Sequence, residues 1–288
     1  MSSQITTAFV EQYSSNVAML AQQMGSRLRG AVDVESVTGR NAFFDQVGIT
    51  AAVLKASRHA DTPQIDTPHS RRRVSLADYE WADLIDDADK VKMLIDPTSS
   101  YAKAAAAAMS RSMDDVVIAA LGGSASAGQT GSTSVALPST SKFSTASQSD
   151  GLTLAKMIAA KKFFDSGDVD PSIPRYIVCG AQQIADLLAI TEVTSADFNT
   201  IRALVAGDID TYMGFKFIMS NRLSLANTDD RLIYAFTQDA VKLAIGKDIT
   251  ARIDVRPDKS YSTQVYNCMT LGAVRMEEAK VFEIPCDE

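Results

Sequence analysis

The side chains that could perform catalysis are few in this sequence, and they are scattered. The only histidines, His59 and His69, lie at the two ends of a polar segment that contains Pro63 and Pro68, without a neighbouring partner that would hold an imidazole in place for acid–base chemistry. No Gly-x-Ser-x-Gly elbow occurs, and Cys179 ends a short apolar segment, where a core position is the simpler interpretation. These residues therefore indicate no catalytic site.

Two groups of aspartates have the residue type that binds magnesium. The first, Asp86, Asp87 and Asp89, is interpreted as a solvated acidic face, and the second, Asp114 with Asp115, as the polar side of a helix. A soluble metal-dependent hydrolase that uses the first group stays open as an alternative. No metal or other cofactor is predicted.

A glycine-rich segment, Gly122 to Gly128, has the composition of a phosphate-binding loop but not its context. It follows a predicted helix rather than a strand, and it lacks the Lys-Ser/Thr pair that such a loop requires. Because Gly, Ser and Thr dominate residues 122–150, this stretch is predicted to be a flexible excursion outside the core.

The composition indicates a globular protein made in a reducing compartment. With 288 residues, 46% of them hydrophobic, the chain can bury a sizeable core. A net charge of −7 argues against a dedicated nucleic-acid-binding protein. The three cysteines are too far apart to suggest a disulfide framework. Neither a membrane-spanning run nor a signal peptide is recognised, so a soluble product of the cytoplasm is expected.

The first part of the chain contains a predicted arm, a hairpin and a long helix. Residues 4–29 place apolar side chains three and four positions apart, which predicts an amphipathic helix, followed by arm-like sequence. Residues 49–57 alternate and a returning strand covers 71–82, so a long hairpin with a polar tip is expected. Residues 97–121, which end at a Gly-Gly pair, predict the clearest helix.

Strands dominate the second part of the chain. In residues 249–257, Ile249, Ala251, Ile253 and Val255 alternate with polar side chains, which predicts a strand with one buried face. The other predicted elements are helices at 151–165, 182–190 and 201–205 and strands at 175–179, 212–220, 232–236, 239–245, 262–273 and 281–286. Long strands with few reactive groups indicate a structural or assembling protein rather than an enzyme.

Taken in order, these elements resemble the major capsid protein of tailed bacteriophages, the HK97-fold family. Gly214–Asn221 is similar to a family strand that begins at glycine and ends in Ser-Asn. Ala235–Ala244, with Asp239 before an alanine, resembles another family segment, and Val281–Ile284 is similar to the family's usual ending. The resemblance covers nearly the whole chain.

The resemblance implies an α+β, HK97-like capsid fold with an N-terminal arm, an extended E-loop hairpin, a long spine helix, and peripheral and axial domains. The implied boundaries are 1–48 for the arm, 49–82 for the E-loop, 83–171 and 246–288 for the peripheral domain with its spine helix at 97–121, and 172–245 for the axial domain. Because the arm is too short to hold a scaffolding segment, a separate scaffolding protein, or none, is expected.

The function implied is that of a coat protein that assembles through pentamers and hexamers into an icosahedral shell around double-stranded phage DNA. The shell would be part of the virion and would form in the cytoplasm of the bacterial host. Implied partners are further copies of the chain, a scaffolding protein, a portal protein and weakly held DNA, with a decoration protein left open and no membrane. An encapsulin-like cargo shell of the same fold also stays open.

The resemblance and the charges of the residues together suggest contact positions. The expected interface residues on the E-loop are Lys55, Arg58, Arg71, Arg72, Arg73, Tyr79 and Trp81. Asp83, Asp86 and Asp87 are candidate acidic partners on an adjacent copy, and Arg27 and Arg29 are candidate inner-face contacts to DNA. For each of them a solvated surface position is the alternative.

Overall fold

The computed structural model describes residues 22–59, 61–86, 98–143, 150–190, 211–226 and 230–287. It divides into two compact units. Unit 1 takes its described residues from 1–26, 78–111 and 247–269, and unit 2 takes them from 27–77, 112–246 and 270–288. The predicted helix at 201–205 lies outside the described residues, as does most of the one at 4–29. The described end of the latter, residues 22–28, is not helical.

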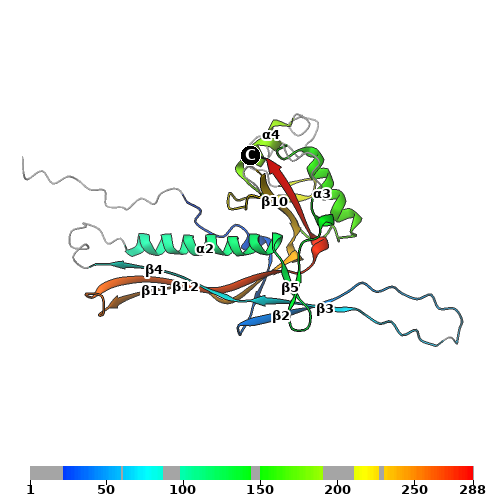
Figure 1. Cartoon of the computed structure of the whole chain (residues 1–288), viewed down its shortest axis with the longest axis horizontal. Helices are drawn as coiled ribbons and strands as arrows, with labels where there is room; N and C mark the ends of the chain where they lie inside the picture. Colours follow the sequence, from blue (N-terminus) through cyan, green and yellow to red (C-terminus); the bar gives the residue numbers. More distant parts are fainter. Residues whose placement is uncertain are drawn as a thin grey trace, which may run out of the picture. The chain divides into compact units, whose positions relative to one another are not determined.

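Unit 1 consists of a long helix and three long strands. They are α2 (Thr98–Gly122), β4 (Ala77–Ile85), β11 (Val241–Arg256) and β12 (Ser262–Arg275), of which α2, β11 and β12 continue into unit 2. With β1 (Asp33–Ser36), the strands form a sheet in the order β1-β11-β12-β4. Figure 1 shows α2 running along the strands of this sheet. The predicted helix at 97–121 and strand at 262–273 are therefore confirmed.

The sequence of α2 explains both its length and its packing. Five consecutive alanines from Ala104 to Ala108 have the highest helix propensity of any residue type. Ala105, Met109, Met113 and Val117, four positions apart, form one buried stripe along the helix. Among the described helices, none combines the length and the apolar character that crossing a membrane requires.

The buried face of β12 contains a polar side chain without a partner. Asn267 is 0% exposed, and neither its amide nitrogen nor its amide oxygen has a hydrogen-bond partner in the described part of the chain. Leaving such a group unsatisfied costs about 1–3 kcal/mol. We therefore expect Asn267→Leu, which keeps the branched shape of the side chain, to raise the free energy of unfolding of the unassembled subunit by about 1–2 kcal/mol.

Urea denaturation followed by circular dichroism measures this effect. Asn267→Asp serves as the opposite control, because it buries a charge at the same place and should destabilise the subunit. A leucine variant that is less stable than the wild type would show that the amide makes hydrogen bonds essential to the fold.

β11 is longer and less buried than the sequence predicts. It runs without a break from Val241 to Arg256. The expected buried face over 249–257 is wrong, because Ile253 is 50% and Val255 56% exposed. β1 pairs with β11 only as far as Ile245, so in the described residues no strand covers this edge of β11 further on. Alternation specifies which side chains share a face, but it does not specify that the same chain covers that face.

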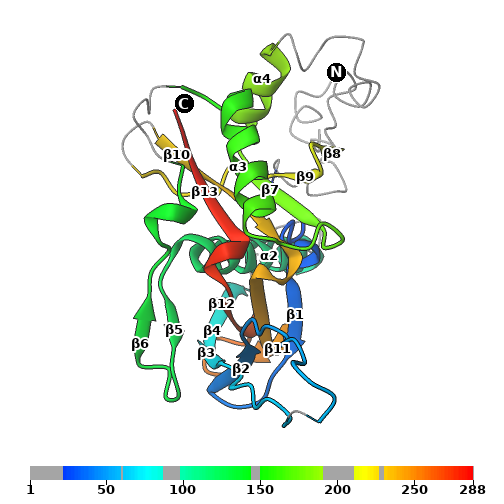
Figure 2. The same ribbon diagram turned by 90° about the vertical axis from the view of Figure 1, so that its right-hand side faces the viewer.

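Unit 2 contains a five-stranded sheet in the order β13-β10-β7-β9-β8. The strands are β7 (Arg175–Cys179), β8 (Thr211–Tyr212), β9 (Phe215–Met219), β10 (Asp230–Thr237) and β13 (Val281–Asp287). Helix α3 (Leu154–Ser166) lies over the sheet in Figure 2, and its buried Phe164 packs with Phe215, Ile177 and Ile233. Helix α4 (Ala181–Ala189) follows β7 directly.

Most of the predictions for this sheet are confirmed. The helices at 151–165 and 182–190 and the strands at 175–179, 232–236 and 281–286 are found within a few residues of their expected places. The strand expected at 239–245 is the first part of β11, in the sheet described above. The strand expected at 212–220 is confirmed over Phe215–Met219, but a single unbroken strand is wrong. Met213 and Gly214 have φ values of 52° and 86° and form the two-residue turn between β8 and β9.

A further sheet of unit 2 corrects the position of the predicted hairpin. Its order is β2-β3-β5-β6, formed by β2 (Asn41–Val47), β3 (His69–Ser75), β5 (Ala125–Ala127) and β6 (Thr133–Val135). The hairpin arms are β2 and β3, whereas residues 49–57, expected as an arm, contain no strand. The returning strand expected over 71–82 is broken at Leu76 into β3 and β4, which belong to different sheets.

The glycine-rich stretch was expected to be a flexible excursion, and this is wrong for its described part. β5 and β6 form a hairpin that extends the sheet beside β3, and Ala125 and Leu137 are buried. Gly128 and Gly131 have φ values of 89° and 69°, and a side chain on Gly131 would collide with Arg73. The small residues therefore permit a tight hairpin against a crowded strand.

Candidate assembly surfaces

The loop between β2 and β3, residues 48–68, exposes apolar side chains. Its base is closed by a hydrogen bond of 2.8 Å from the Gly48 nitrogen to the Pro68 oxygen, and its described residues form no helix or strand. Ile49 and Leu54 are 97% and 92% exposed, and Val53 and Ile65 are also largely exposed. A group of exposed apolar side chains marks an interaction surface. Lys55 and Arg58, two predicted interface residues, are exposed on the same loop.

The edge of β11 in unit 1 is a second exposed surface. Over residues 247–256 it has no neighbouring strand on that side in the described part of the chain. Ile253 and Val255 are exposed there, and Tyr261 is exposed at the turn that follows. An unpaired edge with apolar side chains is a template for an additional strand. Sequence reasoning missed this surface, because its alternating pattern was taken as evidence of burial within one subunit.

Arg71 pairs with an aspartate of its own subunit. Its Nε and Nη2 donate to the two carboxylate oxygens of Asp45, at 2.5 and 3.1 Å. The hydrogen bond from Arg71 lowers the pKa of the Asp45 carboxyl below its ordinary value, and the pKa of Arg71 is raised in return. The guanidinium also lies over the Phe43 ring, 5.4 Å from its centroid. Both partners are exposed, so the pair can still meet another copy.

Arg72 is buried, although a surface position was expected for it as an interface residue. Its Nε donates to the Met276 oxygen at 2.9 Å, and its Nη2 donates to both carboxylate oxygens of Glu278 at 2.8 Å. Arg73 is half-buried beside it and donates to the Thr130 oxygen at 3.3 Å. Two of the three consecutive arginines thus bond within the subunit, Arg72 to the segment that follows β12 and Arg73 to the turn between β5 and β6.

Arg275 is the largest fully buried side chain of the described residues, and sequence reasoning did not select it. Its Nη1 donates to the oxygens of Leu121 (2.9 Å) and Gly123 (2.5 Å) at the end of α2, and its Nη2 donates to the Val135 oxygen (3.0 Å). Its Nε lies 3.6 Å from Glu278. Burial lowers the pKa of this guanidinium. The only sequence signal was an arginine directly after the apolar run Leu271–Val274.

The remaining candidates are distributed over both units. Tyr79, Trp81 and Asp83 are half-buried on β4, and Asp86 accepts a hydrogen bond from the Ser262 hydroxyl. Asp87 lies outside the described residues. Arg27 donates to the Met219 oxygen at 2.5 Å, and Arg29 is half-buried in a short 3-10 helix. The roles of these residues between copies stay predictions.

Asp114 was expected on the polar side of α2, and this is wrong. It is fully buried and accepts hydrogen bonds from the backbone nitrogens of Arg27 (3.1 Å) and Leu28 (3.2 Å). Its carboxylate therefore attaches the chain that precedes β1 to the helix. Asp115, the next residue, is on the outer side and pairs with Arg222. A helical pattern alone does not reveal that a distant segment covers an acidic residue.

Around the residues considered for catalysis, the described part of the chain does not assemble a metal site. The described residues contain no group of three His, Cys, Asp or Glu side chains placed to hold a metal ion. Asp87 and Asp89 lie outside the described residues. Cys179 is buried, as predicted, and burial raises the pKa of its thiol to about 12.

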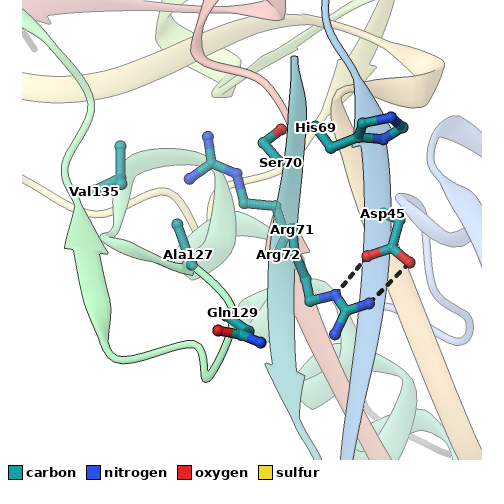
Figure 3. A pocket seen from close by; sticks show the side chains of 9 residues that line it. Asp45, His69, Ser70, Arg71, Arg72, Ala127, Gln129 and Val135 are labelled. Carbon is teal, nitrogen blue, oxygen red and sulfur yellow. Dashed lines mark hydrogen bonds and ion pairs between the residues drawn. The ribbon is translucent and has the colours of Figure 1, made fainter. Parts of the chain in front are cut away.

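A pocket of about 630 Å³ lies beside β3 in unit 2. Figure 3 shows Arg71 and Asp45 on one side of the strand, and Arg72 on the side of Ala127 and Val135. The complete lining consists of Asp45, His69, Ser70, Arg71, Arg72, Ala127, Gly128, Gln129 and Val135. The predicted residues Arg71 and Arg72 thus line a cavity that the sequence did not indicate.

Comparisons with known proteins agree with each other. A family model described as phage capsid protein matches residues 5–288. Among solved structures, the capsid of the cyanophage P-SCSP1u has a TM-score of 0.75 at 15% identity, covering 99% of this chain and 94% of that one. A structure from Mycobacterium phage Che8 has a TM-score of 0.68 at 19% identity (96% and 97% covered). The capsid of Ralstonia phage GP4 has a TM-score of 0.73 at 10% identity (97% and 95% covered). A search of curated proteins finds no match.

Proposed function

This chain belongs to the phage capsid protein family, and from this premise we propose how its copies join. It is a major capsid protein with an HK97-like α+β fold, and its copies form an icosahedral shell. We propose that the loop 48–68 of one copy adds to the β11 edge of a neighbouring copy. The boundaries given above for the arm, the E-loop and the peripheral and axial domains remain predictions.

The observation that carries this proposal is the complementarity of two incomplete surfaces. In the described part of the chain the loop has no partner strand, and no strand neighbours the β11 edge over residues 250–256. Addition of a strand would pair the backbone groups of that edge and give the added segment a defined register. It would also cover Leu54 on one copy and Ile253 on the other, both exposed in the single chain.

Weak, repeated contacts suit a shell that must correct its assembly errors. An extended loop loses conformational freedom when it binds, which lowers the net affinity for a given buried area. Lys55 and Arg58 on the loop add charge to this contact, and Tyr79 and Trp81 on β4 remain proposed interface residues. We also propose ion pairs between copies, from Arg71, Arg72 and Arg73 of one to Asp83, Asp86 and Asp87 of the next.

The other partners are proposed from the family. We propose pentamers and hexamers that assemble in the host cytoplasm with a separate scaffolding protein and a portal protein, with or without a decoration protein. The packaged double-stranded DNA would meet a subunit of net charge −7, which favours weak contact. Arg27 and Arg29 remain proposed as local DNA contacts.

Electron microscopy and light scattering of the purified chain, with its scaffolding protein, test the proposal. We expect closed shells or stable capsomer rings. A monodisperse monomer or dimer under all conditions of salt and concentration would contradict assembly by this chain. Cross-linking mass spectrometry of the shells should then find Lys55 joined to residues of β11 on another copy.

A further inference from the structure

The pocket beside β3 contains a buried cation with an unused donor. Arg72 is 8% exposed, and its Nη1 has no hydrogen-bond partner in the described part of the chain. Its Nε and Nη2 are already occupied by Met276 and Glu278. A buried guanidinium nitrogen without an acceptor is costly, and Arg72 is among the residues that line the cavity.

Two arginines line the pocket, Arg71 and Arg72. Arg71 is matched by Asp45, whereas Arg72 shares the single carboxylate of Glu278 with Arg275. The guanidinium of Arg72 is therefore only partly neutralised, and a carboxylate from outside would complete its pairing.

We infer that this pocket binds a carboxylate side chain of a second copy of the chain. The inference rests on the proposed function, which brings copies into contact. With 35 acidic and 28 basic side chains, each copy presents carboxylates in excess to its neighbours. Asp61 and Asp66, for example, are exposed on the loop 48–68.

The pairing of β3 with β5 allows the pocket to be filled from within. Ala127 is directly opposite Arg72 in this register, so side chains at the two positions share a face, with their Cβ atoms about 5 Å apart. Ala127→Glu places a carboxylate of the same subunit beside the unused nitrogen. Ala127→Gln has the same size without the charge, and it serves as the matched control.

We expect Ala127→Glu to melt at a higher temperature than Ala127→Gln as an unassembled subunit, because the buried donor is satisfied. We also expect it to require a roughly tenfold higher subunit concentration for shell formation, because the incoming carboxylate is excluded. Equal melting and equal assembly of the two variants would overturn the inference. Failure of the wild type and of Ala127→Gln to form any shell would instead contradict the proposed function.

Two further experiments exclude a folding defect as the cause and identify the source of the anion. Gln129→Glu adds a carboxylate from an exposed position of the pocket lining and should repeat the assembly effect. Inorganic phosphate, compared with chloride at equal ionic strength, should raise the melting temperature of the wild type but not of Ala127→Glu. An equal rise in both would place the anion elsewhere and overturn the inference. Stabilisation by duplex DNA that Ala127→Glu abolishes would overturn the assignment to a second copy.

Discussion

Arg275→Met is expected to lower the free energy of unfolding of the unassembled subunit by about 3–5 kcal/mol. The guanidinium is fully buried and donates to carbonyl oxygens at the end of α2 and to Val135 of β6. Methionine fills similar space but leaves those oxygens without donors, and buried oxygens without donors are costly. Glu278 would keep Arg72 as its single partner. Urea denaturation measures this change, and in a thermal melt we expect the melting temperature to fall by roughly 10 °C.

Two control variants separate the contribution of charge from that of geometry. Arg275→Lys keeps the positive charge but cannot reach several carbonyl oxygens at once, so we expect it to lose most of the stability. Arg71→Met removes an exposed arginine from the same sheet and should change stability little. If Arg275→Met were as stable as Arg71→Met, the network at the end of α2 would contribute nothing to the fold.

Ile253→Asp is expected to abolish shell formation while the subunit remains folded. The side chain is half-exposed in the single chain, so the change should cost the isolated subunit little. In the proposed contact it would bury an unpaired charge, which is strongly unfavourable, and the cost would recur at every copy of the contact. Leu54→Asp should have the same effect from the side of the loop. Electron microscopy gives the assembly result, and circular dichroism checks the fold.

The matched control for Ile253→Asp is a substitution of the neighbouring residue on the same strand. Arg252→Gln changes a side chain on the opposite face of β11 and should assemble as the wild type does. Combining Ile253→Lys with Leu54→Asp should recover part of the assembly that each change alone abolishes, if the two positions meet between copies. Normal shells from Ile253→Asp would exclude the β11 edge as the docking site of the loop.

Local sequence signals were sufficient wherever a segment's own residues decide its conformation. The alanine run of α2 and the alternation over residues 249–257, nearly all of which lie in β11, predicted elements that the structure contains. The order of these elements, with a few short motifs, was sufficient for the family. None of this depended on the contacts that any side chain makes with distant parts of the chain.

Predictions were wrong where the outcome depends on what covers a segment. Residues 49–57 alternate like a strand, yet Ile49 and Leu54 are exposed because no described part of the same chain pairs with them. The glycine-rich stretch was taken as a flexible excursion, yet β3 provides an edge to which its hairpin adds. Asp114 was taken as a solvent-facing residue, yet it binds the backbone of a segment 86 positions away.

The sequence by itself determined the α+β class, the long helix, the closing strands and membership of a capsid family, because periodicity and propensity act over a few residues. The tertiary structure alone decided which arginines are buried, where the hairpin arms lie and which apolar faces remain uncovered. The physical reason is that burial and pairing depend on partners distant in sequence. For the loop 48–68 and the β11 edge, we propose that the partner is another copy of the same chain.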